Sequence, residues 1–196
     1  MSQQIETHIQ VDYQNRDRTS SFFRPLLIIP VAVFLMLFTQ FSHWGFSTVA
    51  ITMPAVISLL LRQSYPSWIL AFNHAILEFG TRAVAYALLL TDKYPTFESN
   101  PTVAIIFPDV EGGKKLNRWL PLVKWILAIP LYVVGAFYLV LTTFVTIGAW
   151  FQIFFTGNFP TWAGNVTTGT VRFWNRVYGY SIVLTTDEYP SFSLKN

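Results

Sequence analysis

The stretch from Trp119 to Phe155 constrains the fold of this chain more than any other segment. It reads WLPLVKWILAIPLYVVGAFYLVLTTFVTIGAWFQIFF and contains one charged residue, Lys124. As a single helix it would be about 55 Å long at ~1.5 Å per residue, whereas the hydrocarbon core of a bilayer is only ~30 Å thick. The stretch therefore predicts a hairpin of two short spans, at about 119–135 and 140–156, with its tip near residues 135–143.

A weaker form of the same pattern lies in the first half of the chain. Apolar runs at about 25–41 and 48–61 predict two further spans, joined by a polar tip at Gln40–Ser47. Pro30 lies inside the first run, where a membrane helix is expected to kink rather than stop.

Each predicted hairpin is followed by a segment of mixed polarity and preceded by a short alternating run. The mixed segments, at about 67–90 and 161–183, have a helical pattern that predicts amphipathic helices on the membrane surface. The alternating runs, Ile9–Tyr13 and Val103–Phe107, predict short strand-like segments.

The two halves of the chain match in order. The matched positions include Arg24 with Lys124, Pro30 with Pro130, Tyr65-Pro66-Ser67-Trp68 with Phe159-Pro160-Thr161-Trp162, Arg82 with Arg176, and TDKYPTF with TDEYPSF. Ordered matches of this kind predict an internal duplication, with a first repeat at 1–98 and a second at 99–196. The expected fold class is all-α integral membrane, with two tandem repeats that each contain a transmembrane hairpin and an interfacial helix.

These motifs also carry a resemblance to a known family. The second half begins its apolar part with VKWILAIP, turns at FFTGNFP and ends with RFWNRVYGYSIVLTTDEYPSF. It resembles an uncharacterised bacterial membrane-protein family, domain of unknown function number forty-three eighty-nine. Nearly the whole chain resembles two copies of that unit, and the first copy is degenerate, with RPLLIIP and RQSYP at the corresponding places. The resemblance implies membrane location and repeat architecture, and no activity.

Composition and charge place the chain in a membrane. Charged residues make up 12%, against ~25% in typical soluble domains, and Phe and Trp are abundant, as at membrane interfaces. Neither predicted tip contains Lys or Arg, so all 13 basic residues lie on the other side of the hairpins. The positive-inside rule then predicts a multi-pass protein of the bacterial inner membrane with both termini in the cytoplasm.

The net charge and the polar N-terminal segment argue against a nucleic-acid-binding protein and against a cleavable signal peptide. The net charge of +3 is too small to indicate a nucleic-acid partner. About twenty polar residues precede the first apolar run, so a cleavable signal peptide is not expected.

The first surface helix carries His74, Glu78 and Arg82 on one stripe, because they are spaced four residues apart. This stripe has two interpretations, a polar groove for an anionic headgroup or a partner, and the water-facing side of an amphipathic helix. Arg172 matches Glu78 with the opposite charge, so we expect these two side chains to approach each other. The candidate lipid- or partner-contacting residues are His74, Glu78, Arg82, Arg172, Arg176, Trp68 and Trp162.

The residues show no signature of catalysis or of a cofactor. Cys is absent, and the three His are too far apart in sequence to predict a metal site. No Ser/His/Asp order, Gly-rich phosphate loop or H-E-x-x-H is present. Asp92 and Asp187 could form an acid–base pair, but each is interpreted as the cap of a nearby turn. The predicted spans contain no acidic residue, which argues against a proton or cation relay.

The favoured hypothesis is a non-enzymatic accessory or scaffold subunit of a membrane complex, or a lipid-contacting module. Its expected partners are membrane lipids and either other membrane subunits or a second copy of itself. The alternative is a small transporter or channel with a path between the repeats, for which Thr142, Thr143, Thr146 and Gln152 are candidate lining residues. A lipid-modifying enzyme would have to rely on His74 and Glu78.

Overall fold

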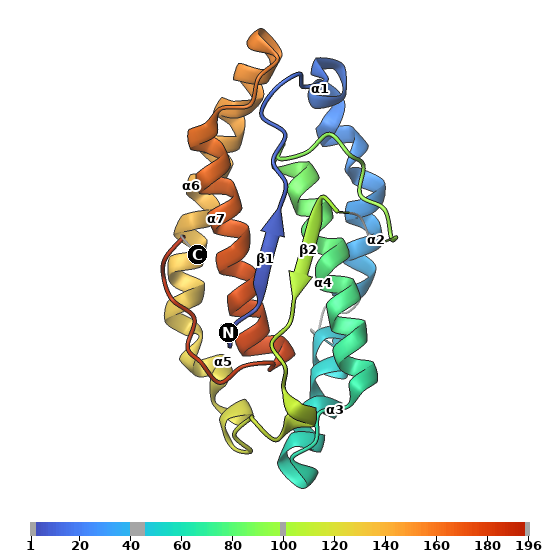
Figure 1. The fold of residues 1–196 in the computed structure, drawn as a ribbon, viewed down its shortest axis with the longest axis vertical. Helices are drawn as coiled ribbons and strands as arrows, with labels where there is room; N and C mark the ends of the chain where they lie inside the picture. Colours follow the sequence, from blue (N-terminus) through green and yellow to red (C-terminus); the bar gives the residue numbers. More distant parts are fainter. Residues whose placement is uncertain (1–2, 40–45, 99–100, 195–196) are drawn as a thin grey trace.

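The structure, a computed structural model, describes residues 3–39, 46–98 and 101–194 and is built mainly of helices (Figure 1). The elements in chain order are β1 (Glu6–Ile9), α1 (Arg18–Leu27), α2 (Ile29–Thr39), α3 (Phe46–Arg62), α4 (Ser67–Ala87), β2 (Val103–Ile106), η1 (Glu111–Gly113), η2 (Leu120–Leu122), α5 (Lys124–Leu127), α6 (Ile129–Thr156), α7 (Thr161–Tyr178) and η3 (Gly179–Val183). Of the three η elements, η1 and η2 are 3-10 turns and η3 is a π-helical turn.

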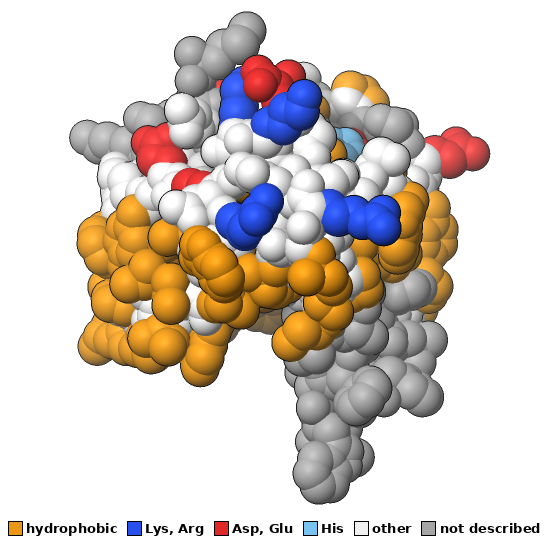
Figure 2. All heavy atoms as spheres, turned by 90° about the horizontal axis from the view of Figure 1, so that it is seen from below, with side chains coloured by type: hydrophobic (Ala, Val, Ile, Leu, Met, Phe, Trp, Pro, Cys, Tyr) orange, Lys and Arg blue, Asp and Glu red, His pale blue; other side chains and the backbone are white. Residues whose placement is uncertain are grey.

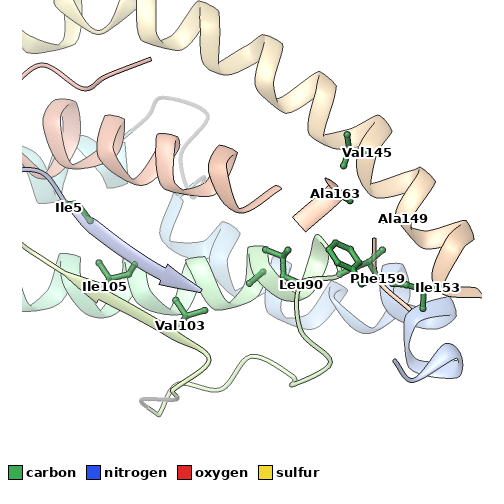
Figure 3. Close-up of a cluster of buried hydrophobic side chains, with 11 residues drawn as sticks. Ile5, Leu90, Val103, Ile105, Val145, Ala149, Ile153, Phe159 and Ala163 are labelled. Atoms are coloured by element: carbon green, nitrogen blue, oxygen red, sulfur yellow. The ribbon is translucent and has the colours of Figure 1, made fainter. Parts of the chain in front are cut away.

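The elements form three layers. β1 and β2 pair antiparallel, with Thr7 opposite Ile105, and this two-stranded sheet covers α7 and α4. α6 packs on α7, and α2 packs on α4, on the side away from the sheet (Figures 1 and 3). β1 of the first half lies on α7 of the second half, and β2 lies on α4. The two halves therefore share one core.

The shared core connects the sheet to the long apolar helix (Figure 3). Its buried members are Ile5, Ala85, Leu89, Leu90, Val103, Ile105, Val145, Ala149, Ile153, Phe159 and Ala163. α6 can approach α7 closely because it presents small residues to it. A Cβ added to Gly135 would lie 2.5 Å from Cζ2 of Trp174.

The second predicted hairpin is wrong, because residues 129–156 form one uninterrupted helix, α6. No proline follows Pro130 within α6, and a glycine in a helix interior costs only about 1 kcal/mol relative to alanine, too little to open a turn at residues 135–143. The remaining part of the predicted span at 119–135 forms η2 and the short helix α5. α5 ends just before Pro130, whose ring conflicts with the carbonyl four residues earlier.

The first half agrees better with its prediction. The runs at 25–41 and 48–61 correspond to α2 and α3, which pack against each other, and Pro30 stands at the start of α2. The predicted tip at Gln40–Ser47 lies almost entirely outside the described residues. Two helical segments, Arg18–Met36 and Ile129–Thr156, are long and apolar enough to cross a membrane.

α4 and α7, predicted as amphipathic helices on the membrane surface, are both helical and form the middle layer of the protein. Most residues of α7 are buried between α6 and β1. A helix this rich in Thr can be buried because its hydroxyls donate to carbonyls of the preceding turn, as Thr167 does to Ala163 and Thr168 does to Gly164. The strand expected at Val103–Phe107 corresponds to β2, whereas the one expected at Ile9–Tyr13 starts where β1 ends.

Candidate lipid-contact face and its two buried ion-pair clusters

Arg24 is the centre of a buried ion-pair cluster at the start of the apolar layer. Its residue exposure is 2%, and its Nη2 lies 2.6 Å from Oδ1 of Asp92. Its Nη1 donates to the carbonyls of Tyr86 and Thr91, and the guanidinium lies 4.3 Å from the ring centre of Tyr86. The other oxygen of Asp92 accepts from the backbone N–H of Asp17, whose own carboxylate caps α1.

Arg16 adds a second guanidinium to this cluster. Its Nη2 lies 3.0 Å from Oδ1 of Asp92 and donates to the carbonyl of Leu89. Asp12 lies 3.8 Å from its Nη1. Asp92 therefore balances two buried cations, with partial help from Asp12.

Lys124 is the centre of a second cluster with the same plan. Its residue exposure is 0%, its Nζ lies 2.6 Å from Oδ1 of Asp187, and it donates to the carbonyl of Thr186. The ring of Tyr180 lies 5.2 Å from the ammonium. The other oxygen of Asp187 accepts from the backbone N–H of Asn117.

Both carboxylates follow a residue with unusual backbone geometry. Leu89 and Leu184 have φ values of 63° and 64°, which for a branched residue is a strained left-handed conformation. Both leucines are buried, and the left-handed turn directs the chain back toward the cation. The clusters therefore tie the segments after α4 and η3 to α1 and α5, the short helices that precede the apolar helices α2 and α6.

The electrostatics of the clusters indicate a structural role. Burial lowers the pKa of the Lys124 amino group, and hydrogen bonding to Asp187 opposes this change. Burial likewise lowers the pKa of the Arg16 guanidinium, and the charge of Asp92 opposes it. A buried charge that loses its partner is strongly destabilising. Arg24 and Lys124 are almost fully buried, and each cation is paired with a carboxylate.

The sequence interpretation of Asp92 and Asp187 as turn caps did not predict these ion pairs. The matched pattern of the two halves could have predicted them. Each half has a cation at the start of its apolar run, Arg24 or Lys124, and a Thr-Asp pair at its end.

The outer side of α5 and α6 is apolar along its whole length. Residues at steps of three or four face outward and are exposed: Ile126, Ile129, Val133, Phe137, Val140, Phe144, Ile147, Phe151 and Phe155. Phe144, near the middle of α6, is 69% exposed. The opposite stripe, which includes Leu131 and Ala149, is buried. Soluble monomers rarely expose an apolar surface this continuous.

The helices of the first half extend this surface. Their exposed apolar side chains are Phe22, Phe23, Leu26, Leu27, Ile29, Val33, Met36, Met53, Ile57 and Leu61. Exposed Trp119, Trp125, Trp68 and Trp162 add the ring type that favours membrane interfaces. Figure 2, which views the molecule along its long axis, shows apolar side chains on one half of the surface and charged ones on the other.

The sheet side is polar. Glu6 and His8 project from β1 as an exposed pair 3.9 Å apart, and Glu111 forms an exposed pair with Lys115. The molecule thus has a charged side that carries the sheet and an apolar side that carries α6.

The predicted stripe on α4, His74, Glu78 and Arg82, makes its polar contacts within the protein. Nε2 of His74 lies 2.8 Å from the carbonyl oxygen of Ile105 in β2. Glu78 lies 2.7 Å from Arg82, as the water-facing interpretation expected, but Arg82 is buried and donates to the carbonyl of Thr96. These residues therefore hold β2 and the segment after α4.

The two arginines of α7 also donate hydrogen bonds to backbone carbonyls of other segments. Nε of Arg172 donates to the carbonyl of Thr7 in β1, and Arg176 donates to the carbonyl of Ser193. Glu78 and Arg172, which we expected to approach each other, do not form an ion pair, because Glu78 pairs with Arg82.

Another pair of matched positions does meet between α4 and α7. Nδ2 of Asn175 donates to Oγ1 of Thr81 at 3.2 Å. Of the seven candidate residues, Trp68 and Trp162 remain the most exposed and available to lipid or a partner.

Two cavities lie along the trough between the α1–α2 segment and α6. One has a volume of about 480 Å³ and is lined by Pro25, Ile28 and Trp150 among others. The other has a volume of about 360 Å³, with Leu35 on one wall, Leu139 on the opposite wall and Thr81 of α4 beneath. Within the described ranges, no three His, Cys, Asp or Glu side chains are grouped closely enough to hold a metal ion.

The chain was compared with protein-family models, curated proteins and solved structures. No protein-family model, curated protein or solved structure matches the chain. The resemblance in the VKWILAIP and TDEYPSF motifs stays a prediction.

Proposed function

We propose that this protein is a non-enzymatic, lipid-contacting membrane module that lies along one leaflet with its sheet in water. The observation that supports the proposal most directly is the exposed apolar side of α6. Lipid tails are the environment in which a continuous row of exposed Phe, Ile and Val carries no cost. The matched clusters at Arg24 and Lys124 support the proposal that two copies of one unit build the module.

The position of the sheet argues against α6 crossing the bilayer. α6 has 28 residues and would be about 42 Å long. β1 packs on α7, on the side away from α6, near the middle of the molecule (Figure 1). If α6 stood upright in the membrane, exposed Glu6 and His8 and the open strand edges would lie in hydrocarbon. Unsatisfied polar groups cost several kcal/mol each in that environment.

Lying flat removes this conflict. The apolar layer is one helix deep, and a helix with its side chains is ~10–12 Å across. Interfacial helices insert ~5–10 Å into a leaflet, so this layer fits the depth of one leaflet. The in-plane arrangement replaces the four-span topology, which required a turn within α6.

The charged side sets the proposed orientation. In the end view of Figure 2, Lys and Arg side chains lie on the polar half of the surface, some of them at the border of the apolar half. Basic residues favour the cytoplasmic side and its anionic lipids. We therefore place the sheet and both termini in the cytoplasm of a bacterial cell, at the inner membrane. Its partners are lipids and, through the same apolar side, membrane subunits or a second copy of the chain.

The transporter alternative has less support. A path between the halves would follow the trough between the α1–α2 segment and α6. The 360 Å³ cavity there is lined by no charged side chain, and Arg24, which borders the 480 Å³ cavity, is already paired with Asp92. An ion or a polar solute would find no charged group in the 360 Å³ cavity to replace its hydration.

The test measures depth along α6. The natural chain has no Cys, so single Cys variants at Ile129, Phe144 and Phe155 accept one nitroxide label each. In vesicles of phosphatidylcholine and phosphatidylglycerol, we expect all three labels at similar depth within one leaflet. A label at His8 is the matched control and should report water.

Two results would contradict the proposal. A label at Phe144 that is much deeper than those at Ile129 and Phe155 would show that α6 crosses the bilayer. Failure of the purified protein to float with vesicles would show that the apolar side is covered by protein.

A further inference from the structure

The 360 Å³ cavity occupies the boundary between the two halves. Its walls come from α2 and α6, and its floor comes from α4 and α7. Leu35 of α2 and Leu139 of α6 both line the cavity, and Leu77 and Val171 occupy matched positions on the floor. The volume lies within the range of ~300–1,000 Å³ typical of small-molecule sites.

Several hydroxyl and amide groups of the lining are paired within the protein, whereas the buried indole N–H of Trp174 has no hydrogen-bond partner among the described residues. Thr142 donates to Thr170 at 2.8 Å, and Thr143 donates to the carbonyl of Leu139. Oγ1 of Thr81 accepts from Asn175. A ligand that enters therefore meets mainly hydrocarbon and paired polar groups, with the indole N–H of Trp174 as an unpaired donor within the described part of the chain. This lining suits an apolar chain and offers little to an ion or a sugar.

Gly80 leaves the space open. It lines the cavity on α4, and a Cβ built on it would meet no atom within 4 Å. The matched position on α7 is Trp174, one of the bulkiest side chains available. The two halves thus differ in size at this point, and the space lies on the Gly80 side.

The second cavity lies at the end of α1, where Arg24, Pro25 and Ile28 line it. It borders the same helix α6 at Ile147 and Phe151 and the end of α4 at Ala87. Phe151 and Ile147 also belong to the exposed apolar side of α6. The trough is therefore continuous with the surface that the proposed function places against lipid.

From this geometry we infer that the trough binds one acyl chain of a membrane phospholipid, between the α1–α2 segment and α6. The inference rests on the proposed function, because it assumes that the trough opens toward lipid. A chain one methylene wide fits between two helices, whereas a protein helix of ~10 Å diameter does not fit the cavity. A bound chain would fill the space beside Gly80 and join the two halves.

The test fills the cavity. Gly80→Leu and Gly80→Phe add side chains to open space, and removing a helix-interior glycine favours the helical state. Gly148→Leu is the matched control, because Gly148 is exposed on α6, outside both cavities, and a Cβ there meets only Trp162 at 3.8 Å. The full-length protein is incorporated into phosphatidylglycerol-containing vesicles, extracted in mild detergent and weighed by native mass spectrometry.

We expect the natural protein and Gly148→Leu to retain one phospholipid per chain, and Gly80→Leu to retain at least tenfold less. Equal retention in Gly80→Leu, or no lipid on the natural protein, would overturn the inference. A lipid-free dimer would overturn it as well, since a second copy would then cover the trough. Nitroxide depth at Phe144 separates the two proposals, because it should be unchanged in Gly80→Leu whichever result the mass measurement gives.

Discussion

Arg24 and Lys124 occupy the same place in the two halves but hold their partners differently. Arg24 uses a planar fork to reach Asp92 and two carbonyls, and Arg16 adds a second cation to the same carboxylate. Lys124 reaches one carboxylate and one carbonyl as a point charge. The comparison shows that the tie between each tail and its apolar helix is preserved, while the number of charges balanced by the aspartate differs.

The largest expected effect is the difference between the two aspartates. Asp92→Ala leaves two buried guanidinium groups without their shared partner, so we expect a loss of about 3–5 kcal/mol in the free energy of unfolding. Asp187→Ala strands only Lys124 and should lose less. Denaturation in mild detergent, followed by Trp fluorescence, measures both. A larger loss for Asp187→Ala would show that Asp12 compensates for Asp92.

A second comparison concerns two helical glycines. In Gly135→Ala the new Cβ would lie 2.5 Å from the Trp174 ring, so we expect a loss of about 1–3 kcal/mol from overpacking. In Gly80→Ala the new Cβ meets open space, so we expect a gain of about 0.5–1 kcal/mol. The same unfolding measurement applies. Similar changes in both variants would indicate that helix propensity, rather than packing against α7, decides the outcome.

Exchanging Arg24 for Lys and Lys124 for Arg tests whether the two ion-pair clusters depend on the shape of the cation or only on its charge. Arg24→Lys removes the planar fork and should cost about 1 kcal/mol through its lost hydrogen bonds to the carbonyls of Tyr86 and Thr91. Lys124→Arg keeps the charge at the other cluster and serves as the reciprocal variant. If Arg24→Lys unfolds at the same denaturant concentration as the natural protein, the fork contributes nothing beyond its charge.

The smallest effect should come from a pair outside both clusters. Glu111 and Lys115 lie 2.8 Å apart, but both are about half exposed, and exposed pairs contribute little because water and salt screen them. We expect Glu111→Gln to unfold at the same denaturant concentration as the natural protein. A clear shift would mean that charge anywhere on the polar side matters, and burial of the two clusters would no longer explain their role.

The sequence by itself determined the apolar segments, their boundaries with polar segments and the matched order of the two halves. Apolar periodicity and proline positions are local, so they located α2, α3 and α4 within a few residues. The sequence also pointed to Trp68 and Trp162 as exposed aromatic residues at element starts.

Only the tertiary structure decided how these segments meet. Length and hydropathy could not distinguish one long α6 from a hairpin, because no single residue in α6 forces or forbids a turn. The pairing of Arg24 with Asp92, and of Lys124 with Asp187, joins residues more than sixty positions apart, which no local pattern specifies. Burial of Arg82 and Arg176 depends on the tails that fold over them. The sheet, finally, exists only because β1 and β2 from different halves meet on α4 and α7, where each strand finds backbone partners and an apolar surface.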